Sequence, residues 1–221
     1  MAASENLKNS LSAAFGAAGY QKEKYTVEPA GFLAFSVAVT PGIYGYAAAS
    51  FFSKIEKLGL FVGFGYSELK IQTDRCFMAL SAQKQLPEMH SVAIPCPAAL
   101  FPAELYVGRP RGDAISTEKT DYLNESVGVV NDCILRGRGA SVRSIESLRD
   151  FLLGDGDPLP WAVFATPNRV VQAAYLLQKT GVKYEEALQI LAPMSEHMRG
   201  FPDFDNYGNE FAFDVARYFF E

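Results

Sequence analysis

The residues of this chain best suited to binding a ligand are arginines in two loop segments. A guanidinium group is planar and can hold a phosphate or a carboxylate through two parallel hydrogen bonds. If the segments around 109–111 and 136–143 meet in the fold, they form an anion site between sheet and helices. The arginines concerned are Arg109, Arg111, Arg136, Arg138 and Arg143, with Arg149 further along.

These arginines also have a simpler explanation, as solvated loop charges. Acidic residues lie close to them in the sequence, at Asp113, Asp132 and Asp150. Exposed ion pairs of this kind are common and need no ligand to account for them. We therefore favour solvated charge over an anion site.

An acidic stretch near the C-terminus resembles a calcium loop only in part. Asp203, Asp205 and Asp214 take the first, third and twelfth positions of an EF-hand pattern. That pattern needs Asp or Asn at the fifth position, where Tyr207 stands, and a bidentate Glu at the twelfth. We predict no metal site here, and interpret the stretch as an acidic turn before the last helix.

The chain has few residues suited to nucleophilic catalysis. His90 and Cys96 are six positions apart in a proline-rich segment, and such a pair can activate a thiolate only if the fold brings the two together. The chain has no Gly-x-Ser-x-Gly, no His-Glu-x-x-His and no phosphate-binding loop. Gly63-x-Gly65 lacks the third glycine of a dinucleotide fingerprint. We predict no catalytic residue and no cofactor.

The charge of the chain argues against nucleic acid as a partner. The formal net charge is −5, and the acidic excess lies in the last third. Residues 169–191 have the spacing of a helix-turn-helix, but the second helix would begin with Glu185 and Glu186. Carboxylates there would face phosphates of the same sign, so an ordinary helical hairpin is favoured.

Aromatic residues are dense at the C-terminus. They are too many for one buried helix face, so the last helix is either buried nearly all round or forms part of an interface. Phenylalanine and tyrosine are enriched at interface cores, which favours a homodimer. The predicted interface residues are Phe211, Tyr218, Phe219 and Phe220.

The elements that must position these residues differ between the two halves of the chain. Residues 4–19 have the spacing of an amphipathic helix, and strands are predicted at 32–39, 43–50, 60–64, 67–72 and 76–81. A helix is predicted at 51–58, between the second and third strands. Short edge strands are expected at 92–94 and 104–107, in a proline-rich connection.

The second half is predicted to be mainly helical. Helices are expected at 117–135, 144–153, from Thr166-Pro167 to Gly181, at 184–198 and at 210–220. The fold class is therefore α+β, with an antiparallel sheet over residues 30–107 packed against an N-terminal helix and a C-terminal helical layer. We favour a single domain over 1–221, the alternative being a subdivision into 1–107 and 113–221.

The composition indicates a cytoplasmic protein. Three widely spaced cysteines do not form a disulfide framework. The N-terminus lacks the basic and apolar regions of a signal peptide, and no apolar run is long enough to span a bilayer. We expect no membrane partner.

Two functions are consistent with the sequence. The first is a non-catalytic protein-binding module, by analogy with secretion chaperones and immunity proteins on size, acidity and fold class alone. The second is a small enzyme or ligand-binding protein that holds an anion with the loop arginines. The sequence favours the first.

Overall fold

The chain folds into two compact units, each of which takes residues from both halves of the sequence. Unit 1 comprises Met1–Gly65 and Ile94–Arg143, and unit 2 comprises Tyr66–Ala93 and Ser144–Glu221. This division does not test the expectation of a single domain, which stays a prediction. The structure is a computed structural model that describes residues 2–23, 32–52, 57–84, 99–100, 106–107, 115–118, 120–136, 138–153, 167–196 and 208–221.

The strands form one sheet with registers that run antiparallel, which confirms the predicted α+β class. Its order is β1-β2-β3-β4-β5, with β6 and β7 also paired to β4. The strands are β1 (Gln21–Lys22), β2 (Phe32–Thr40), β3 (Ile43–Phe52), β4 (Lys57–Tyr66), β5 (Ala99–Leu100), β6 (Tyr106–Val107) and β7 (Ile115–Ser116).

A tight hairpin joins β2 to β3, as the sequence predicts. Thr40 pairs with Ile43 across the turn. Gly42 has φ of 82°, a left-handed conformation that glycine adopts without strain. Further along the hairpin, Phe35 lies opposite Ala47. Paired residues point to the same face of a sheet, so on the face that holds Phe35 the large side chains of β2 lie opposite small residues of β3.

The edge of β4 that lies away from β3 pairs with three short strands, which follow one another along it. Leu100 lies opposite Phe64, Val107 opposite Leu60, and Ile115 opposite Leu58. Together these strands act as one interrupted edge strand. Such interruption shortens the exposed hydrogen-bonding edge on which another chain could pair.

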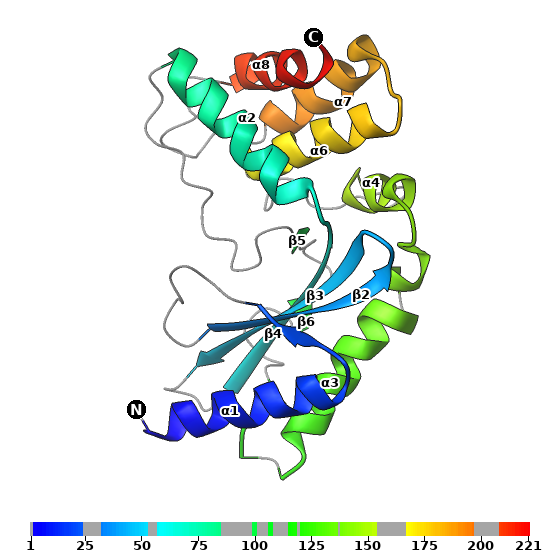
Figure 1. Cartoon of the computed structure of the whole chain (residues 1–221). Helices are drawn as coiled ribbons and strands as arrows, with labels where there is room; N and C mark the ends of the chain where they lie inside the picture. Colours follow the sequence, from blue (N-terminus) through cyan, green and yellow to red (C-terminus); the bar gives the residue numbers. More distant parts are fainter. Residues whose placement is uncertain are drawn as a thin grey trace. The chain divides into compact units, whose positions relative to one another are not determined.

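Two helices of unit 1 cover one face of the sheet: α1 (Ala2–Ala17) and α3 (Tyr122–Asn131) (Figure 1). The Phe15 ring of α1 stacks on Phe35 of β2 with centroids 4.5 Å apart. A π-helical turn, Asp132–Arg136, continues α3 and brings Ile134 against Gly45 of β3. Phe15, Phe35 and Ile134 are fully buried, so this face holds the core of unit 1.

Apart from Tyr66, the last residue of β4, the described residues of unit 2 form helices and the turns beside them (Figure 1). The ring of Phe77 stacks on Phe211, so the first and last of its helices share a core. Its helices are α2 (Leu69–Lys84), α4 (Ile145–Leu153), α6 (Pro167–Lys179), α7 (Tyr184–Glu196) and α8 (Gly208–Phe220).

The predictions for 51–58 and 67–81 were wrong. The helix expected at 51–58 is replaced by the end of β3 and the start of β4, and residues 53–56 lie outside the described part. The two strands expected at 67–72 and 76–81 are one helix, α2. Apolar residues lie on two opposite sides of α2, which obscures the helical period in the sequence. The edge strand predicted at 92–94 lies outside the described residues.

Candidate functional site

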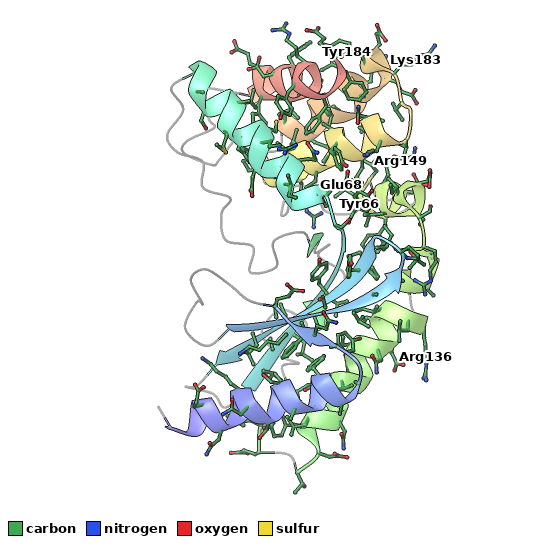
Figure 2. The ribbon with its side chains drawn as sticks, viewed as in Figure 1. Tyr66, Glu68, Arg136, Arg149, Lys183 and Tyr184 are labelled. Atoms are coloured by element: carbon green, nitrogen blue, oxygen red, sulfur yellow. The ribbon has the colours of Figure 1, made fainter. Side chains whose placement is uncertain are left out.

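Two of the predicted anion-site arginines have described side chains, and both are accounted for locally. The Arg136 side chain is 82% exposed, pairs with Asp132 at 3.3 Å, and points away from the ribbon (Figure 2). Arg143 donates from Nη1 to the carbonyl of Val142 at 2.9 Å. Each contact lies within four residues of the arginine in sequence.

The ends of the two arginine segments are anchored at opposite ends of the sheet. The hydroxyl of Thr40, at the β2–β3 turn, donates to the carbonyl of Arg143 at 3.0 Å. Val107 and Ile115, which flank residues 108–114, pair near the start of β4. Only four residues separate that start from the end of β3, so it lies away from the β2–β3 turn.

These anchors leave the described ends of the two segments at opposite ends of the sheet. Arg109 and Arg111 lie outside the described residues, as does the side chain of Arg138. The anion site therefore stays a prediction.

The metal and thiol candidates lie mostly outside the described part. This applies to Asp203 and Asp205, and to His90 and Cys96. Asp214 lies on α8 and takes part in an interaction within the chain. Among the described residues, no group of three or more His, Cys, Asp or Glu side chains is placed to hold a metal ion.

The described cysteines are free thiols. Cys76 is fully buried in α2, and this burial raises its pKa to about 12. Cys133 lies in the π-helical turn, where partial burial and the nearby Asp132 also raise its pKa. Both thiols are therefore weak nucleophiles at neutral pH, since the thiolate is the reactive form.

The predicted aromatic interface divides into buried and exposed residues. Phe211 is fully buried against Phe77, with ring centroids 6.4 Å apart. Phe219 packs on Tyr175 and Phe220 on Tyr184, and both phenylalanines are half-buried. Tyr218, by contrast, is 37% exposed. Whether this group forms a homodimer interface stays a prediction.

A polar cluster that the sequence does not reveal holds the start of α2 to the end of α6. The Tyr175 hydroxyl donates to Oε2 of Glu68 at 2.5 Å, and Lys179 Nζ lies 3.4 Å from the same oxygen. The Lys179 ammonium also lies 5.8 Å from the centroid of the Tyr175 ring. The backbone carbonyl of Glu68 accepts from the Gln72 N–H and begins α2. Figure 2 labels Glu68 at this position.

The cluster shifts the pKa values of Glu68 and Tyr175 in opposite directions. The hydrogen bond from Tyr175, followed by that from Lys179, lowers the pKa of Glu68. Burial, followed by the bond to Glu68, raises the pKa of Tyr175. Both shifts favour a neutral phenol that donates to a charged carboxylate, which is a structural hydrogen bond and needs no ligand.

A second polar contact joins α4 to the turn between α6 and α7. The Arg149 guanidinium donates to Oγ1 of Thr180 at 3.0 Å and pairs with Asp150 at 2.6 Å. Thr180 in turn donates to the carbonyl of Leu176 at 2.8 Å. Arg149, which Figure 2 labels on α4, is therefore committed to holding helices together.

The exposed side of α2 carries a stripe of residues that is apolar except for one arginine. We call it the outer α2 surface and define it as Ile71, Arg75, Met78 and Ala82 with Tyr218 of α8. Ile71 is 52% exposed and Met78 is 73% exposed. Arg75 and Ala82 are also exposed. The opposite side of α2 is buried, through Leu69, Thr73, Cys76, Phe77 and Leu80.

Tyr218 borders this stripe from α8. Burial raises the pKa of its phenol, Cys76 raises it further, and Arg75 lowers it, so the phenol lies near both residues of α2. Among the residues of the outer α2 surface, the sequence analysis predicts only Tyr218 as an interface residue. Ile71, Arg75 and Met78 share one face only when 69–84 is a helix, and strands were predicted there.

The comparisons with known proteins add no relationship. No protein-family model, no curated protein and no solved structure matches the chain. Within the ranges that the structure describes, no helix is both long and apolar enough to cross a bilayer.

Proposed function

We propose that this protein is a non-catalytic protein-binding module that engages its partner through the outer α2 surface. The observation that carries this proposal is the exposure of Ile71 and Met78 on a helix whose other side is already buried. A helix that is apolar on two opposite faces is typical of one covered on both.

Single exposed apolar side chains are ordinary and need no explanation. Ile71 and Met78 differ from that case because they lie seven residues apart, two helical turns along one face. Arg75 lies between them along the helix, and Tyr218 of α8 is near enough for the charge of Arg75 to lower the pKa of its phenol. Methionine, arginine and tyrosine are enriched in interface cores, and arginine and tyrosine dominate binding energy there.

The partner is either a second copy, as expected for a homodimer, or another protein. We propose that the interaction takes place in the cytoplasm, and the wide spacing of the three cysteines, which does not suit a disulfide framework, supports this. Nucleic acid is disfavoured as the partner by the net charge of −5.

Site-specific photo-crosslinking tests this function. A photoreactive amino acid replaces Met78 in the full chain, expressed in the cells that naturally make it, and in a matched control it replaces Lys183, exposed on the α6–α7 turn. We expect a discrete crosslinked product from position 78 that position 183 does not give and that Ile71→Glu abolishes. A product of about twice 24.2 kDa identifies a homodimer. No product, or the same products from both positions, would contradict the proposal.

A further inference from the structure

We infer that the occupant of the outer α2 surface is an amphipathic helix of another protein, which presents a carboxylate to Arg75 between two apolar side chains. This inference rests on the proposed function and specifies its partner. It is argued from the spacing of the exposed residues, from the charge at their centre, and from the effect of placing a second copy there.

The spacing on α2 suits a helix as the occupant. Ile71, Arg75, Met78 and Ala82 follow one another at intervals of four, three and four residues. This is the spacing of a helix–helix seam, in which each side chain packs between residues of the facing helix. A groove-binding helix presents matching residues at the same intervals.

The charge at the centre of the stripe requires an acidic residue in the partner. No carboxylate among the described residues pairs with Arg75, and its neighbours along the seam, Ile71 and Met78, are apolar. A partner that covers Ile71 and Met78 also covers the guanidinium between them. Covering a charge without a counter-charge is unfavourable, so the partner must supply one.

A second copy does not supply that charge. Two identical surfaces that meet across a two-fold axis contact each other with the same residues. The outer α2 surface as defined holds no carboxylate, the adjacent Asp74 already takes part in an interaction within the chain, and Arg75 would approach its own symmetry mate. The acidic excess of the chain, which lies in the last third, adds repulsion between copies. The surface is therefore complementary to a different chain.

A selection experiment tests the charge requirement directly. The probe is a phage-displayed library of one helical peptide scaffold, with its seam positions fully varied, selected against the full-length protein. We expect apolar residues to be enriched at the flanking seam positions, with Asp or Glu at the position between them. Selection against Arg75→Glu should enrich Lys or Arg there instead, and an acidic peptide should bind this variant at least about tenfold more weakly. Lys183→Glu is the matched control and should leave the selection unchanged.

Sedimentation of the wild-type chain and of the Ile71→Lys/Met78→Lys variant tests whether the occupant of the outer α2 surface is a second copy of this chain or a different protein. We expect a monomer in both at tens of micromolar. A dimer that the variant loses would overturn this inference and leave the proposed binding function intact. A crosslinked product from position 78, together with a selection that does not enrich Asp or Glu opposite Arg75, would also overturn this inference and leave the proposed binding function intact. If neither the crosslinking nor the selection finds a partner at this surface, both the inference and the proposed function fail.

Discussion

Gly45 of β3 lies directly against Ile134 of the π-helical turn: a Cβ atom built on Gly45 would stand 2.5 Å from Cγ2 of Ile134. Both residues are buried. The helical layer of unit 1 therefore approaches the sheet more closely at this point than any residue with a side chain would allow.

Replacing Gly45 with alanine should destabilise unit 1. The added methyl group meets a fully buried side chain, and overpacking of this kind costs about 1–3 kcal/mol. Urea denaturation followed by circular dichroism measures the change. Gly45→Ala/Ile134→Ala should be more stable than the sum of the single losses predicts, because truncating Ile134 makes room for the new methyl group. Strict additivity would contradict this contact.

Gly128→Ala should have the opposite effect. Gly128 lies inside α3, and a Cβ built there meets nothing within 4 Å. Alanine is favoured over glycine in a helix interior by about 1 kcal/mol. We expect the free energy of unfolding to rise by about that amount in the same assay. A loss of stability would mean that this face of α3 is covered.

The elements of this fold that the sequence predicts well are those bounded by clear turn or capping residues, even where they are buried on every side, as α6 is over 169–177. The strands predicted at 32–39 and 43–50, on either side of a turn, correspond to β2 and β3, and the helix predicted from Thr166-Pro167 to Gly181 corresponds to α6. α2 was missed because Ile71 and Met78 fill the side that a surface helix normally leaves polar. The residues that obscured the helix are thus the ones that now carry the proposed function.

Contacts between distant segments could not be predicted from the sequence at all. Tyr175 and Glu68 are 107 residues apart, and nothing in either local pattern marks them as partners. The capping pair at the start of α4 is the opposite case, since Ser144 and Ser147 are close enough in sequence for their spacing alone to suggest it.

Ser144→Ala should weaken the start of α4. The Ser144 hydroxyl accepts from the Ser147 N–H at 3.2 Å, and the Ser147 hydroxyl accepts from the Ser144 N–H at 2.9 Å. Loss of such a cap costs about 1 kcal/mol, which lowers the midpoint of urea denaturation. Ser144→Asp keeps an acceptor at this position and is the control. Equal losses in the two variants would show that the hydroxyl does not cap the helix.

Substitutions on the two sides of α2 should differ strongly in their effect on stability. Met78→Lys and Ile71→Lys change exposed side chains and should alter the free energy of unfolding by less than about 0.5 kcal/mol. Leu80→Ala removes a buried side chain from the opposite face and should cost about 2–5 kcal/mol. Thermal and urea denaturation of the isolated chain measure both. If Met78→Lys is as destabilising as Leu80→Ala, then Met78 is already covered within the chain and is not free for a partner.

The bond between Tyr175 and Glu68 should make the effect of Tyr175→Phe depend on pH. The pKa of Glu68 lies below its ordinary value of 4.5 in the folded protein, chiefly because Tyr175 donates to it. A depressed carboxyl pKa contributes stability that is present above the unfolded value and is lost as pH falls through the folded value. Wild type should therefore melt at a higher temperature than Tyr175→Phe at pH 7, and the gap should narrow when the pH is taken well below 4.5.

Tyr184→Phe is the matched control for this experiment. It also removes a hydroxyl from a tyrosine packed on a phenylalanine of α8, but among the described residues that hydroxyl has no carboxylate partner. The difference in melting temperature between Tyr184→Phe and wild type should not narrow in the same way when the pH is lowered from 7 to well below 4.5. A gap for Tyr175→Phe that stays constant over this range would show that the phenol stabilises the protein by packing alone, and that Glu68 is held mainly by Lys179.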